Sequence, residues 1–254
     1  GHSHDDGGSI RLSGLGRPWI IGGGQARASN QWQSVAAPEI RDQRAGHRSG
    51  NGAVIWDEVT AGGGVYGMDL RKVSGAYHER YVSLAGDGHL GIPAAVAMLD
   101  CIDDHLDRSW TWRLTFCAAL DLTFDDDGLG FALAAHDGTM AQCRFLGTAP
   151  QFLRRETCPE SERTFSNGQR VRYPCRPVVA VDFAPTEHLV IYAAIVLTRG
   201  QRIPISRAQG ADLRIGAALW HRPFSHAVPV DYDCLSGGTL SRWPAGRPAL
   251  VNTP

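Results

Sequence analysis

Lysine is almost absent from this sequence, since Lys72 stands alone among 25 basic residues and the others are all arginine. We interpret this bias mainly as genomic base composition, although arginine also suits ligands that carry carboxylates. Charge of either sign is scarce too, with 20% charged residues and a formal net charge of −1. The sequence therefore predicts neither a nucleic-acid partner nor an anionic membrane partner, because each would need a strong positive field.

Long apolar runs and paired cysteines are also missing. The longest apolar run, Leu189 to Leu197, is about half of what a membrane-spanning helix needs. The first residues show neither the basic region nor the apolar region of a secretion signal. No CxxC pair occurs among the six cysteines. We expect buried structural thiols, with a disulfide between Cys158 and Cys175 as an alternative in an oxidising compartment.

The sequence does contain many short segments of period-two or β-branched character, separated by Gly, Pro, Asn and Asp. This pattern predicts an all-β fold, namely a large two-sheet antiparallel β-sandwich with more than about 40% strand and under about 10% helix. The clearest strand runs from Trp110 to Phe116, and its alternation places four large side chains on one core face: Trp110, Trp112, Leu114 and Phe116. Further strands are expected near Ser9–Ser13, Trp19–Ile21, Ala53–Trp56, Arg80–Leu84, Gly130–Ala134, Gln142–Leu146, Val178–Phe183, His188–Leu197, Leu213–Ala217 and Ala218–His221.

The run from Pro93 to Ile102 fits either a helix or a buried strand, and we favour the strand. Two polar stretches without apolar periodicity, Ala45–Gly52 and Arg154–Arg170, are expected to be long loops. We expect residues 1–235 to form one β-sandwich domain. The Gly- and Pro-rich segment Ser236–Pro254 is predicted to be a tail on its surface.

The sharpest chemical feature is the pair His2 and His4 at the N-terminus. Residues two apart on an extended chain point the same way, so both imidazoles can face one metal ion or one substrate. The motif is followed by an alternating strand, a tight turn over Gly14–Pro18 and a second apolar strand, which together predict a hairpin. A solvated, tag-like segment is the alternative interpretation. Metallo-β-lactamases, amidohydrolases and cupins also carry a His-x-His motif, but the residues that follow it here do not fit any of them.

From His2 to Leu12, and again from Gly16 to Gly24, the sequence resembles the start of the C-terminal β-sandwich domain of heparinase II/III-like polysaccharide lyases. The similarity extends over roughly the first 120 residues, through a tyrosine-containing strand (His78–Val82), an apolar run that ends at Asp100 and the Trp-rich strand. The resemblance implies that His2 acts in an active site shared with a preceding α/α toroid, and that His4 is a zinc ligand. The remaining family ligands would fall near Gly22 and Trp32–Gln33, which have the wrong chemistry. Zinc thus stays possible only if other residues complete the site, the candidates being Asp5, Asp6, His47, His78 and His89.

Members of this family cleave uronic-acid-containing polysaccharides by β-elimination. The resemblance therefore implies a lyase reaction on an anionic polysaccharide in the periplasm or outside the cell. The toroid that carries the usual catalytic tyrosine has no counterpart in this sequence, so we expect the chain alone to be inactive. A cluster in one polar loop is a candidate substrate-binding site: Arg41, Arg44, His47 and Arg48.

A second function class remains open, namely a non-catalytic carbohydrate-binding or structural β-sandwich module. Trp110 and Trp112 are expected in the core, whereas Trp32 and Trp56 could stack on a sugar ring.

Overall fold

The computed structural model describes residues 8–22, 36–38, 52–86, 88, 90–106, 108–209 and 212–224. Of these residues 59% are in strands and 2% in helix, which confirms the predicted all-β fold. The helix, α1 (Arg71–Ser74), is one turn long. No helix in this part of the chain has the length and apolar character needed to cross a membrane.

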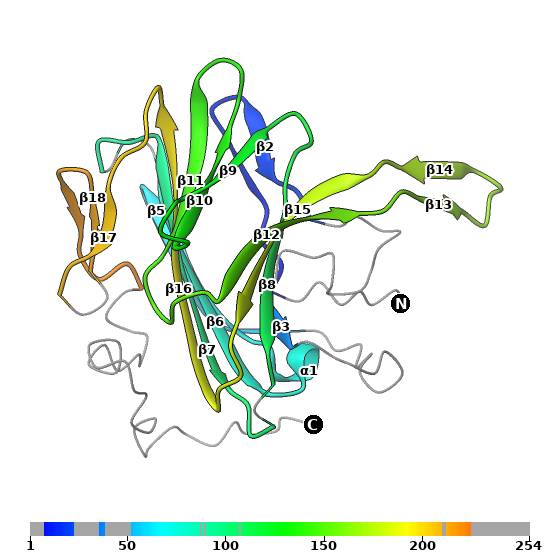
Figure 1. Cartoon of the computed structure of the whole chain (residues 1–254), viewed down its shortest axis with the longest axis horizontal. Helices are drawn as coiled ribbons and strands as arrows, with labels where there is room; N and C mark the ends of the chain where they lie inside the picture. The colour runs from blue at the N-terminus through cyan, green and yellow to red at the C-terminus, as the bar shows by residue number, and fades with distance from the viewer. Residues whose placement is uncertain are drawn as a thin grey trace.

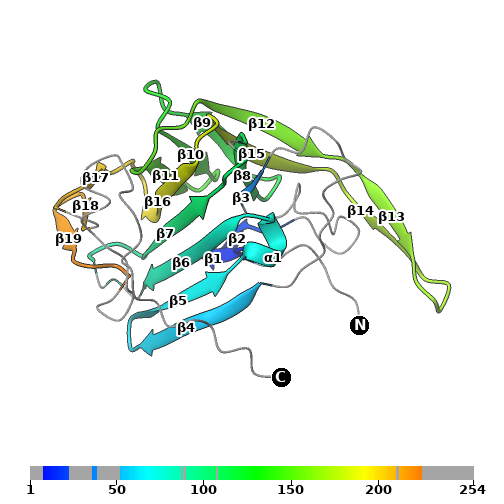
Figure 2. The same cartoon turned by 90° about the horizontal axis from the view of Figure 1, so that it is seen from below.

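The largest element is an eight-stranded antiparallel sheet (Figure 1; Figure 2). Its strands are, in spatial order, β4 (Ala53–Thr60), β5 (Gly63–Asp69), β6 (Tyr77–Ala85), β7 (Ala94–Asp103), β16 (His188–Arg199), β11 (Thr139–Phe145), β10 (Gly130–Ala134) and β9 (Asp121–Phe124). The central strands are almost entirely buried, because both of their faces are covered. The run Pro93–Ile102, which the sequence allowed as either a helix or a strand, forms most of β7. The strand interpretation is therefore confirmed.

A four-stranded sheet packs on one face of the large sheet. Its spatial order is β12 (Phe152–Cys158), β15 (Arg176–Phe183), β8 (Trp110–Thr115) and β3 (Ala36–Pro38). The four alternating side chains predicted for the core, Trp110, Trp112, Leu114 and Phe116, are all fully buried between the two sheets. The prediction for this strand is therefore confirmed.

The other face of the large sheet is covered by a small three-stranded layer, β17 (Ile205–Arg207), β18 (Leu213–Ile215) and β19 (Ala218–Trp220) (Figure 1). Apolar side chains of this layer pack on Tyr81, Leu99 and Tyr192 and form a second core. The large sheet thus carries buried side chains on both faces. This explains why β7 and β16 are continuous apolar runs in the sequence rather than alternating ones.

One loop prediction was wrong. Within Arg154–Arg170 the chain forms β12 and β13 (Ser161–Thr164) and then β14 (Arg170–Tyr173), and β13 and β14 project from the molecule as a hairpin (Figure 1). The residues of this hairpin are exposed or half-buried, and the apolar alternation is limited to Val171 and Tyr173 of the four-residue β14. Backbone pairing between β13 and β14 holds it, and the exposed Arg172 Nε donates to Glu160 Oε1 at 2.6 Å. The turn signal was Asn167–Gly168, where the glycine has φ +80°.

The cysteines of the described residues are all free thiols, and Cys101, Cys143 and Cys158 are buried. Cys158 pairs with Arg176 across the β12–β15 ladder, so the neighbouring Cys175 belongs to the opposite face. This placement favours the predicted structural thiols over a Cys158–Cys175 disulfide. Cys234, the predicted tail Ser236–Pro254 and nearly all of Ala45–Gly52 lie outside the described residues.

Candidate functional site

The described chain begins with the hairpin that the sequence predicts behind the His-x-His motif. β1 (Leu12–Gly14) pairs with β2 (Arg17–Ile20) through a turn in which Leu15 and Gly16 have φ +51° and +77°. The indole N–H of the fully buried Trp19 donates to the carbonyl of Gly14 at 3.0 Å. A bridge from Ile20 to Phe116 then joins the hairpin to the core strand. The hairpin is therefore fixed to the sandwich at its far end.

Gly8 fixes the near end, four residues after His4. Its φ of +79° lies in the left-handed region, and a Cβ at this position would lie 2.6 Å from Cδ1 of Leu70. Both features favour glycine at this position, the backbone conformation more strongly than the contact with the flexible Leu70 side chain. The carbonyl of Gly8 accepts a hydrogen bond of 2.6 Å from Nη1 of Arg80. The segment that follows the histidine motif is therefore bound to the large sheet at Gly8.

Arg80 belongs to a fully buried charged cluster with Asp100 and His78. Arg80 on β6 lies opposite Asp100 on β7, and Nε and Nη2 of the arginine donate to the two carboxylate oxygens at 2.6 and 2.8 Å. His78, two residues earlier on the same face of β6, places Nε2 2.9 Å from Oδ1 of Asp100. The carboxylate of Asp100 thus binds both basic side chains, and Arg80 also binds the carbonyl of Gly8.

The electrostatics of this cluster follow from its burial. Burial raises the pKa of Asp100, but the charge of Arg80 and the hydrogen bonds from His78 and Arg80 outweigh it and lower the pKa to about 2. The pKa of His78 is lowered, because burial disfavours the imidazolium more than Asp100 favours it. We infer a neutral imidazole that donates from Nε2, while Nδ1 has no hydrogen-bond partner. The cluster therefore carries one buried ion pair and one neutral histidine.

This assignment predicts a pH dependence of stability. Since the folded pKa of His78 lies below its unfolded value, the unfolded chain binds more protons as the pH falls below about 6.5, and the fold loses stability. Asp100 adds to the loss only below about pH 4, as the pH falls toward its folded pKa of about 2. We expect the free energy of unfolding to fall by up to about 1.4 kcal/mol per pH unit below pH 6.5.

Urea denaturation of the wild type and of the variant His78→Gln, measured between pH 7 and pH 5, checks this prediction. The glutamine keeps a donor for Asp100 but does not titrate, so the slope should become shallower. The same change at the exposed His136 is the matched control and should leave the slope unchanged. An unaltered slope in His78→Gln would show that the histidine is not the titrating group.

The site residues predicted from the sequence, His2, His4, Arg41, Arg44, His47 and Arg48, all lie outside the described residues, as do Asp5, Asp6 and His89. Their roles stay predictions. Of the other zinc-ligand candidates, His78 already uses Nε2 for Asp100. Gly22 offers no side chain, and its carbonyl accepts from Arg176 at 2.9 Å. Within the described ranges no group of three metal-ligating side chains occurs.

The sequence reasoning missed the Arg80–Asp100 pair. The available signal was one charge of each sign inside two otherwise apolar strands, because buried charges occur in proteins mostly as pairs. Both segments were predicted as strands, but no contact between the two charged residues was drawn from the sequence.

The architecture matches solved structures of heparan-degrading enzymes. A heparan sulfate lyase HepC mutant from Pedobacter heparinus superposes with a TM-score of 0.67 at 14% identity, over 89% of this chain and 38% of that one. The corresponding HepC structure gives a TM-score of 0.63 at 12% identity, over 89% of this chain and 38% of that one. A heparinase III structure gives 0.61 at 11% identity, over 85% and 35% of the two chains. The described chain has the fold of the β-sandwich of heparinase III-like lyases.

This heparinase III-like fold confirms the resemblance drawn from the histidine motif, the hairpin and the later strands. The chain spans a little over a third of the length of these lyases, so it corresponds to one part of them. No protein-family model and no curated protein matches the sequence. At such low identity the match establishes the heparinase III-like fold, and residue roles must be argued separately.

Proposed function

We propose that this chain is the β-sandwich part of a polysaccharide lyase that cleaves uronic-acid-containing glycans by β-elimination. The observation that carries the proposal is the fold match to heparan sulfate lyases over 89% of the chain. The anchoring of the segment behind His2 and His4, through Gly8 and Arg80, supports it. Because the chain covers only 38% of such a lyase, we propose that an α/α toroid precedes it in the complete protein.

The reaction makes three chemical demands. The carboxylate of the sugar must be neutralised, a base must remove the proton beside it, and an acid must protonate the leaving oxygen at position 4. Under the proposal His2 neutralises the carboxylate or transfers a proton, since imidazole titrates near neutral pH. A tyrosine of the toroid serves as the other acid/base group, and His4 faces the sheet and positions the segment. A zinc ion held by His4 would brace this segment only if other residues complete the site.

The proposal includes the substrate and the compartment. Arg41, Arg44, His47 and Arg48 would bind the acidic groups of the polysaccharide, because guanidinium groups pair well with carboxylates and sulfates. A polymeric anionic glycan is met outside the cytoplasm, so we place the enzyme in the periplasm or outside the cell.

The proposal predicts different activities for the chain and for the complete protein. The isolated chain should release no unsaturated product from heparan sulfate, chondroitin or alginate, because it lacks the tyrosine and the floor of the cleft. The longer protein that includes the toroid should release it, as measured by the ultraviolet absorbance of the unsaturated uronate. Turnover by the isolated chain would overturn the division of roles. An inactive complete protein that still binds these glycans would favour the non-catalytic module.

A further inference from the structure

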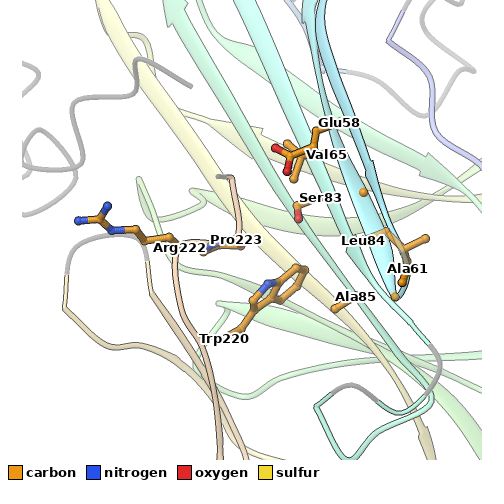
Figure 3. Close-up of a pocket in the computed structure, with 11 residues that line it drawn as sticks. Glu58, Ala61, Val65, Ser83, Leu84, Ala85, Trp220, Arg222 and Pro223 are labelled. Carbon is orange, nitrogen blue, oxygen red and sulfur yellow. The ribbon is translucent and has the colours of Figure 1, made fainter. Parts of the chain in front are cut away.

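A groove lies on the face of the large sheet that is turned away from the Arg80 cluster. It has a volume of about 420 Å³, which is within the usual range for small-molecule sites. One wall is the sheet surface of β4, β5 and β6, and the other is formed by Trp220 at the end of β19 with Arg222 and Pro223 (Figure 3). Its residues are Glu58, Ala61, Gly62, Gly64, Val65, Ser83, Leu84, Ala85, Trp220, Arg222 and Pro223.

The sheet wall is a row of three side chains in register. Glu58 pairs with Val65, and Val65 pairs with Ser83, so the three lie side by side on the same face. The row spans two strand spacings, which is about 9–10 Å. It offers a carboxylate and a hydroxyl on either side of one apolar side chain. The hydroxyl of Ser83 makes no hydrogen bond to the other described residues.

Trp220 provides the facing wall (Figure 3). Trp220 is 8% exposed, and it is one of the residues that line the groove. Its N–H donates to none of the described residues. An aromatic ring of this kind offers a flat apolar surface and one polar edge.

The turn after β19 is held in an unusual conformation. Arg222 has φ +44°, a left-handed value that strains the backbone of a non-glycine residue. The carboxylate of Asp212 holds the turn, because Oδ1 accepts the backbone N–H of Arg222 at 2.8 Å and Oδ2 lies 2.5 Å from Nδ1 of His221. Arg222 is thereby presented at the mouth of the groove, and Figure 3 shows its guanidinium extending away from Trp220.

We propose that this groove binds an acidic oligosaccharide, separately from the cleavage site. A pyranose ring contacts the accessible edge of Trp220, its hydroxyls bind Ser83 and Glu58, and a carboxylate or sulfate on the adjoining unit binds Arg222. The mixture of one aromatic face, one carboxylate, one hydroxyl and one guanidinium suits a polyhydroxylated ring next to an anionic group. The choice of an acidic glycan rests on the proposed function, whereas the binding itself requires no cleavage.

Nuclear magnetic resonance titration of the isolated chain tests the proposal. The probes are a hyaluronan tetrasaccharide, which has carboxylates only, a chondroitin sulfate tetrasaccharide, which adds sulfates, and the neutral cellotetraose. The indole N–H signal of Trp220, assigned with Trp220→Phe, should shift with an apparent Kd on the order of 1 mM. The signals of the fully buried Trp19, Trp110 and Trp112 are internal controls and should stay in place.

Two variants separate binding from folding. Arg222→Gly removes the guanidinium and relieves the strain of the left-handed backbone, so the melting temperature should stay the same or rise. The affinity for the two acidic probes should fall about tenfold. Glu58→Gln on the exposed β4 should weaken all three probes. Arg214→Gln, an exposed arginine of β18 outside the groove, is the matched control and should have no effect.

The probes also decide which acidic group Arg222 binds. If chondroitin sulfate binds more tightly than hyaluronan, Arg222 binds a sulfate. If the two bind with equal affinity, Arg222 binds the carboxylate. Cellotetraose should bind about tenfold more weakly than hyaluronan. No shift of Trp220 with any probe, or equal shifts in Arg222→Gly and wild type, would overturn the proposal. Because no cleavage is measured, an inactive complete protein would leave this result standing.

Discussion

Replacing Arg80 by methionine should lower the free energy of unfolding by about 3–5 kcal/mol, among the largest effects expected for a single change in this chain. The variant leaves the carboxylate of Asp100 buried without its main counter-charge, and it leaves the carbonyl of Gly8 without the donor of its 2.6 Å hydrogen bond. Both losses occur at buried groups, the Asp100 carboxylate and the Gly8 carbonyl, where water cannot replace the missing partner. Urea denaturation at pH 7 measures the effect.

Arg172→Met is the matched control for this prediction. Arg172 also pairs with a carboxylate, but its side chain is 72% exposed on the projecting hairpin, so we expect no measurable change. The double variant Arg80→Met/Asp100→Leu removes both charges and should recover much of the loss, because no unpaired ion is then buried. An Arg80→Met protein as stable as Arg172→Met would contradict the role given to the cluster.

Under the proposed function, His2→Ala in the complete protein should reduce turnover by about 10²- to 10⁴-fold with little change in melting temperature. The reason is that a group that neutralises the substrate carboxylate or transfers a proton acts on the reaction and not on the fold. His4→Ala should act in the opposite sense and lower stability first, by about 1–3 kcal/mol for a lost buried hydrogen bond. Steady-state kinetics and thermal denaturation of the two variants separate these outcomes.

The control for both histidine variants is His136→Ala, which changes an exposed histidine in the turn between β10 and β11. This variant should match the wild type in rate and melting temperature. If His2→Ala and His4→Ala behave like His136→Ala, the N-terminal histidines form a solvated segment without a catalytic or structural role.

The sequence predicted the strands whose pattern comes from burial. Trp110 to Phe116 alternates because one face of β8 packs on the large sheet, and Leu189 to Leu197 is continuously apolar because β16 is covered on both sides. The sequence did not predict β13 and β14 in the same way, since β13 contains no apolar residue and the alternation of β14 extends over only four residues. The Asn167–Gly168 turn was the remaining signal.

The candidate site was predictable only in its local part. The hairpin after the histidine motif could be derived from neighbouring residues, because turn chemistry acts over a few positions. The Gly8–Arg80–Asp100 connection joins residues 72 and 20 positions apart, and that pairing depends on the register between β6 and β7. A single sequence contains no direct record of that register.

The outer strand β4 determines which further strands could pair with the sheet. It ends the eight-stranded sheet in the described part of the chain, and its Val54 and Val59 are 65% and 86% exposed (Figure 2). Such an edge would accept another strand by backbone pairing. However, Asp57 and Glu58 lie at its centre, and two copies aligned antiparallel about this centre would place carboxylate against carboxylate. The edge therefore discriminates by charge: it repels its own copy and favours a strand with basic residues at the facing positions.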